Sequence, residues 1–365
     1  MIPGLADFAL PFLRNLDPEK AHELTLRALE AGLYPRQSMA DDPRLAQTVW
    51  GLGFSNPVGI AAGFDKGARV PEEILNSGFG FAEIGTVTPQ PQPGNPRPRI
   101  FRLPADKGMI NRLGFNSEGH AAVLARMKRL GRRGLKGVVG VNIGANKDSG
   151  DRDADYVAGL EIFAPVADYL TVNISSPNTP GLRDFHALDE LDRLLGKLMT
   201  KRNGLTKAGG AACPVTVKLS PDIADEEVAP ICDKLLAHKV DGIIVSNTTL
   251  DRPNLTGLNG SEAGGLSGAP LFQRSTRLLA KVYVHTRGAI PLIGVGGITS
   301  GATALGKIEA GASLIQLYTG LVYEGPGLVG RIKSALVAGI ERAGTQSIDG
   351  LIGSKADEWS QKSLN

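Results

Sequence analysis

The sequence has little cysteine and no excess of charge of one sign. Two cysteines, Cys213 and Cys232, occur in 365 residues, and neither their number nor their spacing supports a disulfide framework or a metal site. We therefore expect a reducing compartment. Forty basic residues against 37 acidic ones give a net charge of +3, which is too balanced to indicate a nucleic-acid-binding protein.

Long apolar runs are also absent. No stretch reaches the roughly 18 apolar residues that a membrane-spanning helix needs. The N-terminus lacks a basic segment followed by a small-residue cleavage site, so we expect no secretory signal. The length and the ordinary balance of apolar and charged residues suit a single α/β barrel with additions.

What the sequence does contain is a repeated alternation of apolar runs and helical patterns. Most runs are near-continuous in Val, Ile, Leu and Ala, as expected for parallel strands buried on both faces. Eight β–α units predict a closed (β/α)8 TIM barrel, and a doubly wound open sheet is the alternative. The apolar runs are 58–64, 81–88, 138–144, 169–175, 215–220, 242–247, 292–297 and 314–319, and the helical patterns are 117–130, 187–202, 225–238, 272–286, 300–310 and 327–342.

Polar residues gather where these runs end. Active sites of parallel barrels are built at the carboxyl ends of the strands, so this bias predicts an enzyme. Structural polar residues would favour neither end of a strand. The residues at or just beyond the run ends are Lys66, Thr86, Asn142, Asn173, Lys218, Ser246, Asn247, Gly297 and Tyr318.

Two insertions interrupt the repeat. Residues 89–116 are proline-rich and predict a hairpin arm that ends in a polar loop around Asn111, Arg112 and Asn116. Residues 248–271 are rich in Gly and Asn and predict a flexible lid. We expect both to cover the site.

The ends of the chain differ from the barrel. An apolar stripe at helical spacing runs through residues 2–13, and Asp17–Pro18 predicts the start of a second helix. These helices either lie in a membrane interface or pack on the barrel. The last twenty residues are polar, and we expect them to fray. The predicted division is an N-terminal helical extension at 1–40, the barrel at 41–345 and a C-terminal tail at 346–365.

The stretch from Asn173 to Asp184, NISSPNTPGLRD, carries the most chemical information. Asn173 and Asn178 each offer a donor and an acceptor, which suits a flat heterocycle with alternating carbonyl and N–H groups. Ser176 precedes a proline at a point where a turn would direct its hydroxyl towards a ligand. Such composition also favours a plain turn.

Glycine-rich ends of the last two runs predict a phosphate pocket. GVGGI at 294–298 and LYTG at 317–320 would offer backbone N–H groups, and Gly268 would add another. Lys218 has two readings: a Schiff-base lysine of an aldolase, or a cation that faces the carbonyl edge of a flavin. Lys66 would bind a substrate anion.

Together these motifs resemble the dihydroorotate dehydrogenase family, in its class 2, quinone-dependent and FMN-containing form. The resemblance covers roughly residues 45–340, and the N-terminal helices resemble the membrane and quinone-binding extension of that class. The motifs are AAGFDK, EIGTVTPQPQPGNPRPR, INRLGFN, NIGANK, NISSPNTPGLR, NTTLDR, GGLSG and GVGGI.

The resemblance implies a role for each matching residue. Ser176 stands where class 2 enzymes have their catalytic base; class 1 enzymes use a cysteine, and neither cysteine here lies in a matching loop. Ser246 replaces the usual threonine and keeps the hydroxyl. FMN contacts are expected at Ala62, Gly63, Lys66, Thr86, Asn142, Asn173, Lys218, Ser246, Gly268, Gly297, Tyr318 and Thr319. Dihydroorotate contacts are expected at Lys66, Asn111, Arg112, Leu113, Gly114, Phe115, Asn173, Asn178, Asn247 and Thr248.

The reaction that the resemblance implies is the oxidation of (S)-dihydroorotate to orotate in pyrimidine biosynthesis. Ser176 would remove the C5 proton while C6 delivers hydride to flavin N5, with Thr179 and the region of Phe115 helping to move the proton. A membrane quinone would reoxidise the flavin through residues 1–36. A monomer on the cytoplasmic face of a bacterial inner membrane is expected, without a metal. The residues alone also allow another FMN barrel oxidoreductase, an aldolase or a non-catalytic binding barrel.

Overall fold

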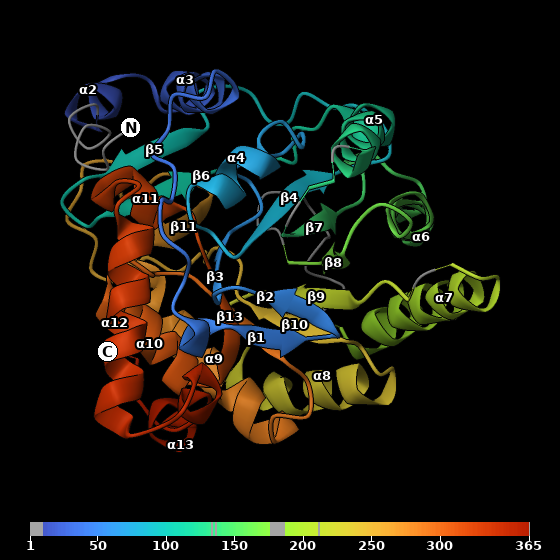
Figure 1. Ribbon diagram of the computed structural model, residues 1–365. Helices are drawn as coiled ribbons and strands as arrows, with labels where there is room; N and C mark the ends of the chain where they lie inside the picture. The colour runs from blue at the N-terminus through green and yellow to red at the C-terminus, as the bar shows by residue number, and fades with distance from the viewer. Residues whose placement is uncertain (1–9, 133, 136, 176–186, 211, 365) are drawn as a thin grey trace.

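Eight parallel strands close into a barrel in the order β10–β12–β13–β3–β4–β7–β8–β9 (Figure 1). The computed structural model describes residues 10–132, 134–135, 137–175, 187–210 and 212–364. The closed barrel confirms the predicted fold class and excludes the open sheet. The strands are β3 (Val58–Ile60), β4 (Phe81–Val87), β7 (Val138–Ile143), β8 (Tyr169–Asn173), β9 (Val215–Leu219), β10 (Gly242–Val245), β12 (Leu292–Val295) and β13 (Ala312–Leu317). Seven of the predicted runs contain one of these strands, and the run 314–319 overlaps β13, which begins two residues earlier.

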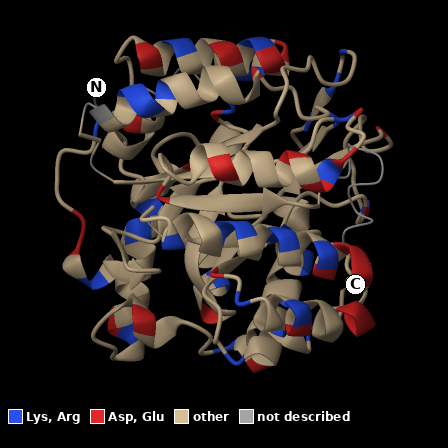
Figure 2. Ribbon diagram, turned by 90° about the vertical axis from the view of Figure 1, so that its right-hand side faces the viewer, with Lys and Arg blue, Asp and Glu red and all other residues tan. Residues whose placement is uncertain are grey.

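Helices surround the barrel, and charged residues of both signs are spread over them while the strands carry few (Figure 2). Strands buried on both faces explain why the runs are apolar throughout. The larger helices are α5 (Gly119–Arg132), α6 (Arg152–Phe163), α7 (Leu188–Lys207), α8 (Asp225–Ala237), α9 (Phe272–Thr286), α10 (Gly301–Glu309) and α12 (Leu328–Ala343), and the shorter ones are α4 (Pro71–Asn76) and α11 (Thr319–Glu324).

Helix α6 was not predicted, and the reason lies in what it buries. Asp153 and Gly159 are on its buried side together with Tyr156, Leu160 and Phe163. The Asp153 carboxylate accepts from Arg193 at 2.7 Å and from Lys197 at 2.8 Å. A buried carboxylate and a glycine interrupt the apolar stripe from which a helix is recognised.

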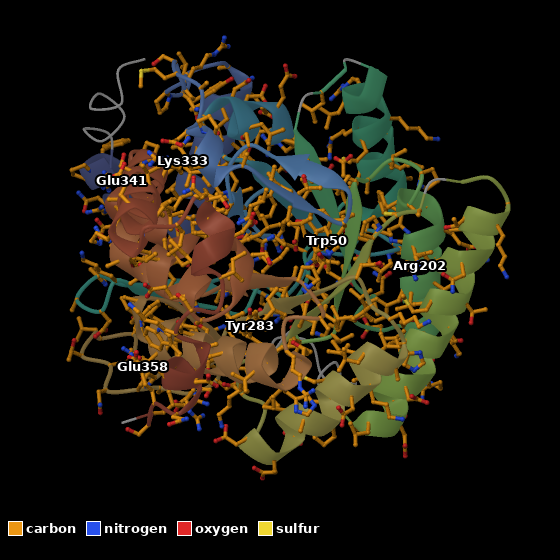
Figure 3. All side chains as sticks on the ribbon, turned by 60° about the horizontal axis from the view of Figure 1, so that its bottom comes forward. Trp50, Arg202, Tyr283, Lys333, Glu341 and Glu358 are labelled. Carbon is orange, nitrogen blue, oxygen red and sulfur yellow. The ribbon has the colours of Figure 1, made fainter. Side chains whose placement is uncertain are left out.

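A two-stranded hairpin closes the amino-terminal end of the barrel. It consists of β1 (Gln47–Val49) and β2 (Leu52–Phe54), and Trp50 at its turn occupies the centre of Figure 3. The Trp50 ring lies 5.3 Å from that of Tyr169, and its Nε1 donates to the Asp241 carbonyl at 2.5 Å. This closure leaves the opposite, carboxyl end as the open mouth.

The two insertions form one small sheet beside that mouth. Strands β5 (Ile100–Leu103) and β6 (Gly108–Asn111) make the hairpin predicted in residues 89–116. Strand β11 (Gly265–Gly268), from the second insertion, pairs antiparallel with β6. The second insertion is also anchored to the hairpin, because Asp106 accepts from the Thr256 and Gly257 amides at 3.0 Å.

The N-terminal helices lie next to this sheet (Figure 1). They are α2 (Leu10–Asn15) and α3 (Pro18–Glu30). Asp17 caps α3 as predicted, with its carboxylate accepting from the Glu19 and Lys20 amides. Ion pairs hold α3 to the barrel: Arg69 binds Glu23 and Glu30 at 2.8 and 2.7 Å, and Arg99 binds Glu19 at 2.8 Å. The predicted stripe before residue 10 lies outside the described residues.

The prediction that the last twenty residues fray is wrong for the described part of the tail. A short 3₁₀ helix (Ile348–Leu351) and α13 (Ala356–Ser360) pack on the barrel helices. Trp359 is buried, and its ring meets that of Phe272 edge to face at 5.7 Å. A few well-spaced apolar residues anchor a segment whose overall composition is polar.

Candidate active site

A pocket lies at the carboxyl ends of the barrel strands, under the small sheet. The carboxyl ends of seven strands, the loops that follow them and the two insertions bring together residues that are far apart in the chain. The residues that line the pocket include Ala61, Ala62, Gly63, Lys66, Thr86, Ile100, Met109, Asn111, Leu113, Gly114, Phe115, Asn173, Lys218, Ser246, Asn247, Thr248, Ser267, Gly268, Gly296, Gly297, Gln316, Tyr318 and Thr319.

Most of the residues predicted from the sequence therefore meet in one place. Asn142 and Arg112 are exceptions, because neither lines this pocket. Ser176, Asn178 and Thr179 lie outside the described residues. Asn142 is fully buried behind Thr86 and bonds to it.

Arg112 turns away from the pocket towards the second insertion. Its Nη1 binds Glu262 at 2.7 Å, and its guanidinium stacks 4.5 Å from the centre of the Phe101 ring. The residue therefore joins the hairpin arm to the cover over the site, although the neighbouring Asn111 and Leu113 line the pocket as predicted.

One end of the pocket is built from glycine backbone. Gly296 and Gly297 have φ of +102° and +78°, which L-residues rarely adopt. A Cβ at Gly297 would lie 2.4 Å from Phe272, and one at Gly268 would lie 2.3 Å from the Lys107 carbonyl. Only glycine fits here, and the exposed backbone N–H groups suit a phosphate.

A buried lysine supports this glycine loop from behind. Lys307 is fully buried and donates to Ser275 Oγ at 2.6 Å, and that hydroxyl lies 2.8 Å from the Leu271 carbonyl and 3.1 Å from the Gly296 carbonyl, between which it shares its proton. Burial holds the pKa of Lys307 well below its usual range. Phe272 lies beside the same lysine, 5.6 Å from Nζ to the ring centre.

Lys218 projects from the end of β9 into the pocket. It is 6% exposed and forms no hydrogen bond or ion pair with another described residue. Burial lowers its pKa, and the buried carboxylate of Glu83 opposes that shift. A buried cation without a direct partner fits a ligand that carries, or develops, negative charge.

Lys66 is a second cation of the pocket. Its Nζ donates to Asn116 Oδ1 at 2.5 Å. Burial first, and then the nearby charge of Arg99, lower its pKa to about 7. A bound anion would raise that pKa again, so anion binding and proton uptake at Lys66 are coupled.

A chain of polar side chains runs from the interior of the barrel to the pocket. Asn142 lies between Glu83 and Thr86, at 2.8 and 2.6 Å. Asn173 donates to Thr86 at 2.9 Å and accepts from Asn247 at 3.2 Å. The amides that face the ligand are therefore not free to rotate.

Tyr318 separates the pocket from the N-terminal helices. It lines the pocket, and its hydroxyl lies 3.2 Å from Nδ1 of His22 on α3. The Phe64 ring meets both, at 5.4 Å from His22 and 5.4 Å from Tyr318. The pocket and the extension therefore share a wall of aromatic rings.

Sequence reasoning missed several lining residues. Ile100, Met109 and Ser267 come from the small sheet, whose pairing the sequence did not reveal. Gln316 and the buried Glu83 lie inside runs that were classed as apolar. These two residues could have been found from the sequence, because a charged or amide side chain in the middle of an apolar run is unusual.

These features define a closed α/β barrel with a pocket at the carboxyl ends of its strands, lined by lysines, amides and glycine backbone. Among the described residues, no group of His, Cys, Asp and Glu is placed to hold a metal ion. No helix in the described part of the chain has the length and apolarity needed to cross a membrane.

Comparison with known proteins identifies the family. The model of the dihydroorotate dehydrogenase family matches residues 44–340. Dihydroorotate dehydrogenase (quinone) of Rhizobium rhizogenes is 53% identical over 365 residues, and that of Rhizobium meliloti is 52% identical, each over the whole of both chains. A crystal structure of the Eimeria tenella enzyme with ferulenol has a TM-score of 0.91 at 39% identity, over 95% of this chain and 98% of that one.

The chain belongs to the dihydroorotate dehydrogenase family, and these relatives place it in the quinone-dependent class. The family inferred from the motifs is thereby confirmed. Enzymes of this family are flavin-dependent, and membership in it excludes the aldolase alternative.

Proposed function

We propose that this enzyme oxidises dihydroorotate to orotate in pyrimidine biosynthesis and passes the electrons through FMN to a quinone. The observation that carries the proposal is the content of one pocket. Lys66 and Lys218, which form no ion pair with a described residue, line it together with the amides of Asn111, Asn173 and Asn247. These groups suit a carboxylate, a pyrimidine ring and an electron-rich cofactor edge.

The specific cofactor is FMN because the glycine end of the pocket suits a single terminal phosphate. The backbone at Gly268, Gly296 and Gly297 and the hydroxyl of Thr319 provide donors there. Ser267 Oγ lies 2.9 Å from Thr319 Oγ1 and holds that hydroxyl in place. When bound there, FMN would supply two-electron redox chemistry between the substrate and the quinone.

The protein supplies binding, orientation and proton transfer. Lys66 pairs with the substrate carboxylate, and the fixed amides of Asn173 and Asn247 hold the pyrimidine ring in the reacting geometry. Asn178 adds a further amide. Ser176 removes the C5 proton, with Thr179 passing it on, and the cover residues exclude water.

Turnover of a substrate panel tests the proposed function. The purified protein, with a soluble quinone, should oxidise dihydroorotate and leave dihydrouracil, which lacks the carboxylate, essentially untouched. The released flavin would be identified as FMN if its fluorescence does not rise after phosphodiesterase treatment. Equal rates with both substrates would contradict the assignment of Lys66.

Replacing Lys218 by methionine should weaken flavin binding about 10- to 100-fold. The estimate corresponds to about 1.5–3 kcal/mol for a hydrogen bond to a charged group. Methionine fills a similar volume, so packing should be retained. Quenching of flavin fluorescence by the apo-protein measures the affinity, with the exposed Lys128→Met as a matched control. Equal affinities in all three proteins would show that Lys218 does not hold the cofactor.

We further propose that the quinone arrives through α2 and α3. The Arg102 guanidinium donates to the carbonyls at the end of α2, including that of Leu16 at 2.6 Å, and so fixes α2 beside the barrel. Tyr318 and His22 lie between α3 and the pocket. An apolar molecule entering between the helices would reach the wall of the cofactor site.

The outer faces of these helices support peripheral membrane association. Phe12 is 65% exposed and Leu24 is 45% exposed, and large apolar side chains in that state favour a lipid interface. We place this surface, formed by residues 1–36, on the cytoplasmic side of a bacterial inner membrane, with the enzyme as a monomer.

Acid should destabilise the fold between pH 6.5 and 4 through two histidines. Burial is the main cause that lowers the pKa values of His22 and His120 to about 4, while an unfolded histidine titrates near 6.5. The unfolded chain therefore binds more protons in this window, so stability is full above it and falls as the pH falls. Each histidine should contribute about 2–3 kcal/mol to that loss.

Urea unfolding at pH 7 and at pH 4.5 measures the effect. His22→Phe and His120→Phe should each reduce the difference between the two free energies of unfolding. The two sites lie on different helices, so the double variant should lose both contributions additively. An unchanged pH dependence in the double variant would exclude the histidines as the cause.

A further inference from the structure

Glu83 is a fully buried carboxylate that the reaction described above does not use. It lies in the middle of β4 and does not line the pocket. Its Oε1 accepts from Asn142 Nδ2 at 2.8 Å, and its Oε2 accepts from Gln316 Nε2 at 2.7 Å and from the Tyr169 hydroxyl at 3.0 Å. All three partners donate, which is the pattern of an ionised carboxylate that can only accept.

This acceptor fixes the direction of every hydrogen bond between it and the pocket. Asn142 must turn its NH₂ group to Glu83, so its Oδ1 faces Thr86 and accepts that hydroxyl at 2.6 Å. Thr86 has then used its only proton, so its oxygen accepts from Asn173 Nδ2 at 2.9 Å. Asn173 Oδ1 in turn faces Asn247 Nδ2 at 3.2 Å.

We call the series of hydrogen bonds that runs from Glu83 to Asn247 the relay. It ends in side chains that a ligand in the pocket would meet. Thr86, Asn173 and Asn247 line the pocket. The second N–H of Asn173 Nδ2 bonds to no other described residue and remains as a donor for a ligand. With the relay reversed, Asn173 would turn its carbonyl to Thr86, and the pattern of donors and acceptors at that wall would change.

We propose that Glu83 is a positioning residue that sets the orientation of the Asn173 amide through Asn142 and Thr86. Asn247 then meets the Asn173 carbonyl with the amide orientation that it takes from the Thr248 N–H, which its Oδ1 accepts at 2.8 Å. The inference rests on the proposed function, in which these amides hold the pyrimidine and the flavin. The negative charge of Glu83 also acts on Lys218, whose pKa burial lowers and Glu83 raises. Its negative charge therefore moderates the positive field at the cofactor.

Glu83→Gln tests the relay, because glutamine has the same shape and can donate as well as accept. The hydrogen bonds between residue 83 and the pocket could then run in either direction. Orotate binding to the flavin-loaded enzyme, measured by the perturbation of flavin absorption, should weaken about tenfold or more, as expected for about 1.5 kcal/mol. The reduction potential of the bound flavin should become more positive, because a nearby negative charge is removed.

Two further variants separate the relay from a general effect on packing. Tyr169→Phe removes one donor to Glu83 but leaves the relay intact, so its orotate affinity should remain within about twofold of the wild type, a small effect on the energy scale of one hydrogen bond. Asn142→Leu cuts the relay and should weaken orotate binding as Glu83→Gln does. In the Asn142→Leu background, Glu83→Gln should cause no further loss. Asn142→Leu alone decides the matter if Glu83→Gln does not fold.

Normal orotate affinity in Glu83→Gln or in Asn142→Leu would overturn the inference. Fully additive losses in the double variant would do so too, because they would mean that the two residues act independently. A wild-type enzyme that binds neither flavin nor orotate would instead refute the proposed function. The wild-type enzyme is therefore measured before any variant.

Discussion

Ser176→Ala is expected to slow the reduction of bound flavin by dihydroorotate about 10²- to 10⁴-fold, which is the usual contribution of a general base. Alanine cannot accept the C5 proton, and orotate binding should change little because the amides and Lys66 remain. Stopped-flow absorption at the flavin band, without oxygen, measures the step directly. The quinone half-reaction should keep its wild-type rate.

The described residues just before Ser176 lie beside the pocket, which supports the proposed role of that serine. Asn173 ends β8, and Ser175 is buried and lies 3.0 Å from Asn247 Nδ2. Strand β8 therefore ends at the pocket wall formed by Asn173 and Asn247. Ser176→Cys is the matched variant, since a thiol is also a base and should recover part of the rate. Wild-type reduction by Ser176→Ala would make the assignment of the base wrong.

Deleting residues 1–36 should abolish quinone reduction and membrane attachment while leaving a flavin-containing barrel. The helices supply the outer side of the Tyr318 wall, where His22 meets the Tyr318 hydroxyl. A long-chain quinone would have no apolar site in the truncated protein. A small, water-soluble electron acceptor needs no such site, so its reduction by dihydroorotate should continue.

The deletion also exposes Arg69 and Arg99, whose partners Glu19, Glu23 and Glu30 lie on α3. Phe12→Ser with Leu24→Ser is therefore the milder companion variant, because both side chains are exposed and make the outward surface polar without removing an ion pair. It should reduce binding to lipid vesicles and keep the flavin. Full turnover with a long-chain quinone after the deletion would contradict the proposed route.

The barrel could be predicted because the same sequence pattern, an apolar strand followed by polar residues, occurs eight times. Each strand is buried on both faces, so each run is apolar, and the polar residues that follow the runs meet at one rim. The β1–β2 hairpin was missed because its two strands are only three residues long, and the positive φ of Trp50 and Gly51 at its turn, +57° and +77°, is visible only in the structure. No local rule connects that hairpin with the end of the barrel that it closes.

The sequence predicted which residues belong to the site better than it predicted where their side chains point. Motifs identify a loop, but the direction of a side chain depends on partners that are distant in sequence. Arg112 illustrates this, since Glu262, 150 residues away, draws it out of the pocket. Asn142 likewise lies behind Thr86, because Glu83 inside the barrel holds its amide. The predicted roles of Ser176 and Asn178 rest on the sequence, because both lie outside the described residues.

Anaerobic titration of the purified holoenzyme tests the central claim most directly. Dihydroorotate should bleach the flavin absorption with one equivalent per site and yield one equivalent of orotate, and a quinone added afterwards should restore the oxidised spectrum. A flavin that dihydroorotate leaves oxidised, or that a quinone cannot reoxidise once it is reduced, would contradict the account.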